Sequence, residues 1–189
     1  MKSFLIVLIL IFSLQTWVKA DIIKFEIEGM SIGDSALNFF SEKDIKNNSK
    51  DYYRDKTYTP VQNDKYSFFE IYDAVDFNFR TGDKGYILQS ISGVLYFDKK
   101  NIKDCYNKMD SLISDIKEEL NYIKYHSKKE HIHPADMSGE SKFTEARFDL
   151  KNGYIGIICY DYSMVKSQDH LSVYVDTKEF NQWARGDIY

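Results

Sequence analysis

The amino-acid sequence predicts an α+β protein with a single mainly antiparallel sheet of about six or seven strands, one long helix packed on one face, and short helices near both ends. Three observations lead to this fold class. Several runs alternate apolar and polar residues, short turns rich in Gly and Asn separate many of these runs, and one long segment has the periodicity of a helix. Strands joined by such short turns pair in the antiparallel sense.

The first predicted strand covers residues 21–28, where apolar residues occupy alternate positions. Gly29 ends this run. The next residues favour a tight turn, after which either Ser31 or Asp34 is suited to cap a short helix through residues 36–40. The domain is therefore expected to open with a strand, a turn and a short helix.

The following part of the chain predicts a polar segment and then a three-stranded meander. Residues 42–62 lack a clear period and favour a loop or a weak helix. Residues 66–72 and 75–80 are typical of strands, and residues 81–85 have the composition of a hairpin turn. Residues 86–97 form the third predicted strand, in which an internal glycine indicates a bulge or bend.

The clearest helix is predicted from the cap residue Asn101 to Tyr125. Apolar residues recur there at spacings of three and four, while the other face is charged. The apolar positions are Ile102, Cys105, Met109, Leu112, Ile116, Leu120 and Ile123. This stripe predicts a helix that covers one face of the sheet.

The C-terminal third predicts a polar loop, three strands and a last helical turn. The loop is expected over residues 126–142. Residues 143–150 and 154–162 alternate on either side of an Asn-Gly pair, which is the strongest short hairpin signal. A further strand is predicted at residues 170–176, and Thr177 is suited to cap the final helical turn.

The first 20 residues have the organisation of a cleavable secretory signal peptide. Lys2 supplies a positive charge, an apolar run follows, and small residues precede the expected cleavage after Ala20. An uncleaved membrane anchor would need about 20 apolar residues, and this run is roughly half as long. The sequence therefore predicts a signal peptide at 1–20 and one exported α+β domain at 21–189, periplasmic or secreted, without a stable membrane span in its mature form.

The charge of the chain argues against nucleic acid as a partner. The formal net charge is −4, and loss of residues 1–20, which hold two lysines and no acid, makes it −6. Affinity for nucleic acid depends largely on Lys and Arg contacts with phosphates. The expected partner is instead another envelope or extracellular protein, and the sequence leaves the oligomeric state open.

The two cysteines, Cys105 and Cys159, predict one structural disulfide. Disulfides persist in the oxidising compartments to which exported proteins travel, and an even count without a C-x-x-C motif favours a bridge. Cys105 lies on the apolar stripe of the long helix, and Cys159 is in phase with Ile155 and Ile157 on one face of its strand. The alternative is a pair of buried free thiols that pack as small hydrophobic side chains.

One segment brings imidazoles and carboxylates together and is a weak candidate for a metal site. On an extended chain His131 and His133 point the same way, so both could reach one zinc or copper ion, with Asp136 or Glu130 adding an oxygen. The alternative is a solvated polar loop. This site would carry metal only weakly.

The sequence favours a non-enzymatic binding or accessory protein that needs no cofactor. It contains no H-E-x-x-H or phosphate-loop motif. Two alternatives stay open: an exported enzyme whose site is assembled from dispersed carboxylate and Tyr residues, and the weak metal-binding protein. Asn47 begins a glycosylation sequon, which matters only on a eukaryotic secretory route.

Residues 25–37, with the sequence FEIEGMSIGDSAL, resemble the opening of small uncharacterised exported bacterial proteins. More distantly, this strand, glycine-punctuated turn and helix are similar to the start of the BamE-like and beta-lactamase-inhibitor-like families. The resemblance implies a periplasmic α+β domain that works by protein contact. It carries over no functional residue, and this chain lacks the lipobox cysteine of BamE-like proteins.

Overall fold

The computed structural model of the chain describes residues 22, 25–64, 66–98, 101–120, 124–134, 136–163 and 168–186. The predicted signal peptide at residues 1–20 lies outside this part of the chain. None of the helices in the described ranges combines the length and apolar character needed to cross a membrane.

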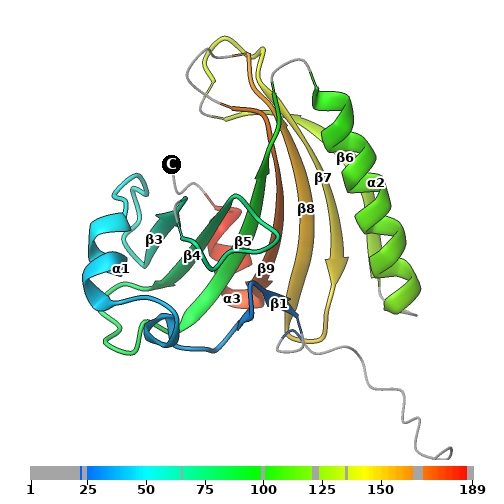
Figure 1. Ribbon diagram of the computed structural model, residues 1–189. Coiled ribbons are helices and arrows are strands. Elements are labelled where there is room, and N and C mark those ends of the chain that lie inside the picture. The colour runs from blue at the N-terminus through cyan, green and yellow to red at the C-terminus, as the bar shows by residue number, and fades with distance from the viewer. Residues whose placement is uncertain are drawn as a thin grey trace, which may run out of the picture.

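Seven antiparallel strands form the main sheet, in the spatial order β3-β4-β5-β9-β8-β7-β6 (Figure 1). In chain order they are β3 (Tyr58–Asn63), β4 (Ala74–Arg80), β5 (Leu88–Tyr96), β6 (Lys124–Ile132), β7 (Lys142–Asp149), β8 (Gly153–Asp161) and β9 (His170–Thr177). After β5 the chain crosses to the far edge and returns by three hairpin connections, so β9 closes the sheet at its centre. The predicted α+β class with one large antiparallel sheet is confirmed.

The long helix α2 (Ile102–Glu119) contacts β8 and β9 and makes the crossing from β5 to β6. Of its buried residues, Cys105 and Met109 belong to the predicted apolar stripe, whereas Ile113 was not predicted to be part of it. Cys105 is bonded to Cys159 of β8, with 6.0 Å between the two Cα atoms. The predicted disulfide is therefore confirmed, and it joins the first turns of the helix to the sheet.

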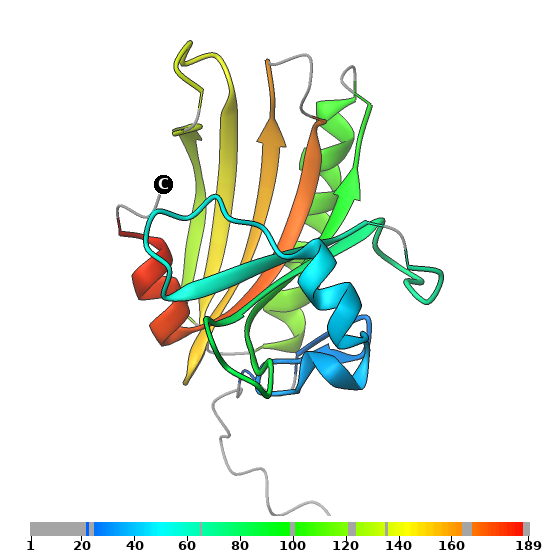
Figure 2. The same ribbon diagram turned by 90° about the vertical axis from the view of Figure 1, so that its left-hand side faces the viewer.

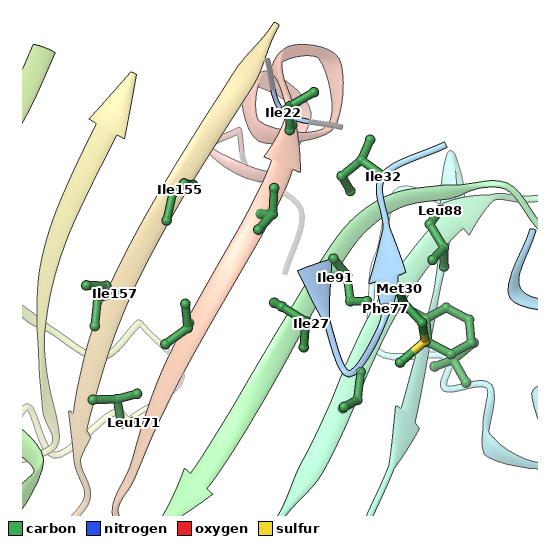
Figure 3. Close-up of a cluster of buried hydrophobic side chains, with 14 of the residues drawn as sticks. Ile22, Ile27, Met30, Ile32, Phe77, Leu88, Ile91, Ile155, Ile157 and Leu171 are labelled. Carbon is green, nitrogen blue, oxygen red and sulfur yellow. The ribbon is translucent and has the colours of Figure 1, made fainter. Parts of the chain in front are cut away.

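The sheet face towards α2 is apolar because alternate residues of each strand turn to that side. Ile155, Ile157 and Leu171 lie there, in the same core as the residues that pack under α2. A two-stranded hairpin of β1 (Glu26–Ile27) and β2 (Met30–Ser31) extends this core. Figure 3 shows the hairpin's Ile27 and Met30 over the β4 and β5 side chains of the sheet.

The opposite face carries polar and aromatic side chains and is partly covered by α3 (Lys178–Ala184). Thr177 caps this helix, as predicted, by accepting a hydrogen bond from Phe180 N at 3.1 Å. Phe180 packs edge-on against Tyr58 of β3, and Asn181 donates to Asp176 of β9. In Figure 2, α2 lies behind the sheet, while α3 and the segment leading into β3 lie in front of it.

The N-terminal segment differs from its prediction in three respects. Among the described residues of the strand predicted at 21–28, only Glu26–Ile27 form a strand. Gly29 does not end the first strand alone, because Glu28 and Gly29 form a two-residue turn between β1 and β2. The following helix is a short 3-10 turn, η2 (Ala36–Asn38), and its cap is Ser35 rather than Ser31 or Asp34. Ser35 is the cap because its side chain accepts a hydrogen bond from Leu37 N. The Asp34 side chain instead accepts a hydrogen bond from Ser31 N.

The segment predicted as a loop or weak helix at 42–62 contains both a helix and a strand. Ser41 caps α1 (Glu42–Asn48) by accepting from Asp44 N at 3.1 Å. The edge strand β3 follows, and it tolerates Pro60 because an edge strand need not supply a backbone donor on its outer side. Lys50 N after α1 donates to the Pro60 carbonyl at 2.8 Å.

The predicted long helix is confirmed over most of its length, but its C-terminal end and the first part of the polar loop after it are wrong. The helix ends at Glu119 instead of Tyr125. Tyr125 lies in β6 and pairs with Phe148 of β7, and their rings lie 5.0 Å apart. Much of residues 126–142 forms the same edge strand. Its side chains are exposed on both faces, so it lacks the apolar alternation by which a half-buried strand is recognised.

The open edge at β6 is protected against pairing with other chains. Its register shifts between His126 and Lys129, and Lys124, Lys128 and Lys129 are exposed along it. Bulges and lysines are the devices by which natural sheets prevent pairing at an edge. This edge is therefore a poor site for the addition of a further strand.

Candidate functional site

The large exposed apolar side chains are the starting point for locating a binding surface, because contiguous apolar patches mark interaction sites. Among the described residues they are Leu37, Tyr52, Phe68, Ile71, Tyr96, Ile132 and Met137. Two of them, Phe68 and Ile71, lie three residues apart in the connection between β3 and β4. We call residues 66–73 the β3–β4 loop.

The backbone of the β3–β4 loop is held by the side chain of Glu28, from the turn between β1 and β2. The Glu28 carboxylate accepts hydrogen bonds from three consecutive backbone N–H groups, those of Glu70 at 2.9 Å and of Ile71 and Tyr72 at 2.8 Å each. Partial burial acts to raise the pKa of Glu28, but the three hydrogen bonds outweigh it and lower the pKa below its ordinary value. The carboxylate is thus held in its charged form.

The backbone of Glu28 is unusual for a residue with a side chain. Its φ is 51°, in the left-handed region that favours glycine, and Gly29 follows with a φ of 75°. Two positive φ values in succession are typical of the tight hairpin turns that usually carry Asn-Gly or Asp-Gly. A glutamate at the first of these positions has the reach to contact the loop, which is more than 40 residues away in the sequence.

The end of the β3–β4 loop is anchored by two residues that lead into β4. Asp73 N donates to the Val94 carbonyl at 2.9 Å, and its carboxylate accepts from Tyr96 N at 2.8 Å. The ring of Tyr72 lies on Gly93 so closely that a Cβ there would be 2.5 Å from the ring carbons. The predicted bulge at this glycine is wrong: Gly93 pairs in register with Val75 and Val173 and leaves room for Tyr72.

Aromatic packing fixes the middle of the loop. Phe40, which is buried, has ring centroids at 5.0 Å from Tyr66, 5.6 Å from Phe68 and 6.5 Å from Phe69. Phe68 and Phe69 pack edge-on at 4.8 Å. These contacts explain why residues 66–72 do not form the predicted strand: their aromatic side chains pack together on Phe40 instead of alternating between two sheet faces.

Phe68 and Ile71 remain at the surface of this anchored loop. Phe68 is 40 % exposed and Ile71 is 69 % exposed, although the backbone between them is bonded to Glu28. Apolar side chains on a fixed backbone lose little conformational entropy when they bind a partner, so such a loop is pre-organised for contact. No local sequence pattern predicts this site, because neither anchor, Glu28 nor Phe40, is close to the loop in sequence.

A second notable feature is a row of five rings across the polar face. Tyr96, His170, Tyr160, Phe143 and His131 occupy paired positions on the neighbouring strands β5, β9, β8, β7 and β6. Successive ring centroids are 6.0, 4.5, 5.8 and 4.9 Å apart. Neighbouring strands lie about 4.8 Å apart, so one ring per strand in register gives this spacing.

The ring row is better explained as a stabilising ladder than as a binding platform. Tyr160 and His170 lie at 28° to each other, and Phe143 and His131 at 15°. At centroid distances of 4.5 and 4.9 Å, rings so nearly parallel must overlap face to face, because flat neighbours would collide. In these two pairs the ring faces that meet are therefore used by one another.

The three predicted metal candidates take part in separate contacts. His131 stacks on Phe143, while His133 Nε2 lies 3.3 Å from the hydroxyl of Tyr162. Burial lowers the pKa of His133. Across the described ranges, no cluster of three or more His, Cys, Asp or Glu side chains could hold a metal ion.

Asp136, the oxygen donor of that hypothesis, is buried in the loop between β6 and β7. Its carboxylate accepts hydrogen bonds from the Ser138 hydroxyl at 2.6 Å, from Ser138 N at 2.9 Å and from Ser141 N at 2.8 Å. The Ser163 hydroxyl, from the segment after β8, donates to the same carboxylate at 3.2 Å. These bonds, led by that of the Ser138 side chain, hold the pKa of Asp136 well below its usual range. Asp136 thus orders its loop.

The carboxylate and Tyr side chains of the polar face are connected to each other and to α3. Tyr174 donates to Glu145 at 2.6 Å, and Arg185 donates to the same carboxylate oxygen at 2.7 Å. Arg185 also donates to Asn181, which donates to Asp176 at 2.9 Å. This network fixes the C-terminal helix on the sheet, so these carboxylates have structural partners.

Asp76, on β4, is the carboxyl group most affected by its surroundings. Burial raises its pKa to about 7, and the nearby Asp64 acts in the same direction, against a hydrogen bond from Gln62. A raised pKa means that the folded protein binds a proton that the unfolded chain has lost. Asp76 therefore contributes less to stability as the pH rises from about 4 through about 7.

We expect the Asp76→Asn variant to be more stable than the wild type at pH 8 by roughly 1–2 kcal/mol, with a smaller difference at pH 4, because Asn resembles the protonated acid. Urea unfolding of both proteins at several pH values measures this. Asp51→Asn, which alters an exposed carboxylate, is the matched control and should leave the pH profile unchanged. Parallel profiles for Asp76→Asn and the wild type would contradict the assignment.

Comparison with protein-family models, with curated proteins and with solved structures found no match to this chain. The resemblance of residues 25–37 to exported bacterial proteins and to the BamE-like and beta-lactamase-inhibitor-like families therefore stays a prediction.

Proposed function

We propose that this protein is an exported, non-enzymatic binding protein, periplasmic or secreted, that contacts another envelope or extracellular protein through its β3–β4 loop. The observation that carries the proposal is the pairing of two exposed apolar side chains, Phe68 and Ile71, with a backbone fixed by Glu28. Protein recognition depends on a few apolar or aromatic side chains presented by a rigid frame.

Two other surfaces are less suitable for protein contact. In the ring row, four of the five rings stack in two pairs, at centroid distances of 4.5 and 4.9 Å. The β6 edge carries a bulge and lysines that oppose strand addition. In the loop, Phe68 also packs on neighbouring rings, but it stays 40 % exposed beside Ile71, which is 69 % exposed on a backbone bonded to Glu28.

The proposed location outside the cytoplasm is supported by two features that belong to different parts of the chain. The first 20 residues have the order of a signal peptide. Cys105 and Cys159 form a disulfide, and such bonds persist mainly in oxidising compartments. A signal peptide and a structural disulfide are the combination expected of an exported domain.

The proposal is tested by placing the photo-crosslinking amino acid p-benzoylphenylalanine at position 71 of the full chain. The experiment uses the cells in which this protein is naturally produced. Irradiation is expected to join the chain to one discrete protein, which is then purified and identified. The same amino acid at position 137 is the matched control, because Met137 is 98 % exposed but lies in the loop between β6 and β7. No adduct from position 71, or the same adduct from both positions, would contradict the proposal.

Binding of the purified partner should then depend on the two apolar side chains. Ile71→Ser and Phe68→Ala are each expected to weaken binding by about 10-fold or more, since each removes apolar area from the interface. Ile132→Ser, at a side chain that is 64 % exposed on β6, should leave the affinity unchanged. Titration calorimetry measures all three, and equal affinities throughout would refute the role of the loop.

A further inference from the structure

We infer that the partner surface that receives the β3–β4 loop is an apolar pocket bordered by Lys and Arg side chains. This inference rests on the proposed function and specifies the chemistry of its partner. It follows from the charges that surround the two exposed apolar side chains.

The acids around the loop outnumber its bases. The segment 64–73 contains Asp64, Glu70 and Asp73, all exposed, against one lysine in its sequence. Glu28 adds a further carboxylate directly under the loop backbone, kept charged by its three hydrogen bonds. Ile71 thus lies next to the exposed Glu70, so the apolar contact has an acidic border.

A second observation places carboxylates together at the base of the loop. Tyr96 is 41 % exposed, and its backbone N–H donates to Asp73. Burial raises the pKa of Tyr96, and the charges of Asp76, Asp64 and Asp73 raise it further. Three carboxylates from both ends of the loop and from β4 therefore act on a single exposed phenol.

This arrangement favours a basic partner for a physical reason. Docking of an acidic border against acids would place like charges together, which costs several kcal/mol and suppresses wrong partners. Lys or Arg around the receiving pocket would instead attract the loop during approach. Charges at the border of an interface mainly change the association rate and its salt dependence, while buried apolar anchors mainly change dissociation.

The test uses the partner captured at position 71 and measures association and dissociation rates by surface plasmon resonance at 50 and 500 mM NaCl. The double variant Asp64→Asn, Glu70→Gln is expected to lower the association rate about 10-fold at 50 mM NaCl and to have little effect at 500 mM. Its dissociation rate should stay close to that of the wild type.

The matched control is the double variant Glu118→Gln, Glu119→Gln, which removes the same net charge from the exposed C-terminal end of α2. It should keep most of the association rate. If the loop variant associates at the wild-type rate or faster, or if both double variants slow association equally, a basic border on the partner is excluded. In that case a loss of binding in Ile71→Ser would still support the proposed function, whereas an unaffected Ile71→Ser would contradict both.

Discussion

Removal of the disulfide between Cys105 and Cys159 is expected to lower the free energy of unfolding by about 4 kcal/mol under oxidising conditions. The bridge joins residues 54 positions apart, and closure of a loop of that size restricts the unfolded chain by about this amount. The double variant Cys105→Ala, Cys159→Ala removes the bridge without leaving an unpaired thiol. Equilibrium unfolding in guanidinium chloride measures the difference.

The reducing agent dithiothreitol provides the internal control for this experiment. Reduced wild type has lost the same constraint, so it should unfold within about 1 kcal/mol of the double variant, the remainder being the cost of deleting two buried sulfur atoms. A difference that stays the same with and without reductant would show that packing, not the bridge, stabilises α2 on the sheet.

The sequence predicts those parts of the fold whose signals are local. The helix α2 is recognisable because apolar residues such as Cys105 and Met109 recur on its buried side. The hairpin of β7 and β8 is recognisable from its Asn-Gly pair and its alternation, and Leu150 N indeed donates to the Gly153 carbonyl across that turn. The disulfide was predicted because Cys105 and Cys159 lie on the apolar sides of α2 and β8, and because an exported protein is expected in an oxidising compartment.

The missed elements lack such signals for physical reasons. An edge strand such as β6 has water on both faces, so nothing requires its residues to alternate. Apolar and polar residues alternate in part over residues 66–72, but the rings of Tyr66 and Phe68 pack on Phe40, which lies 26 or more positions away in the chain. The ring row depends on strand register, which no short segment reveals: His170 meets Tyr160 only because β9 pairs with β8.

The contact between Glu28 and the loop is indicated by one feature of the local sequence, the Glu-Gly pair between Ile27 and Met30. A Glu in place of the usual Asn or Asp of such a turn indicates that its side chain has another use, since the left-handed conformation disfavours it. Nothing local says where that side chain points. Only the structure places it under residues 70–72.

Replacement of Glu28 by Ala is expected to lower the free energy of local opening of the β3–β4 loop by about 3 kcal/mol, because three backbone donors lose a charged acceptor. The effect should concentrate on the loop. Hydrogen exchange at the amides of Glu70, Ile71 and Tyr72 should accelerate by about 100-fold, while amides in the centre of β9 change only with global stability. Exchange measured by NMR separates the two.

Two further variants distinguish the carboxylate from its backbone. Glu28→Gly relieves the positive φ yet removes the acceptor, so it should still free the loop amides, whereas Glu26→Gln, at an exposed neighbour, should not. Because the pKa of Glu28 is lowered in the folded protein, its contribution is complete only above the ordinary glutamate pKa of 4.5 and is lost as the pH falls through the lowered value. Loop exchange in the wild type, corrected for intrinsic rates, should therefore approach that of Glu28→Ala in acid. Unaltered exchange in Glu28→Gly would mean that Phe40 and the loop aromatic residues hold the backbone without the carboxylate.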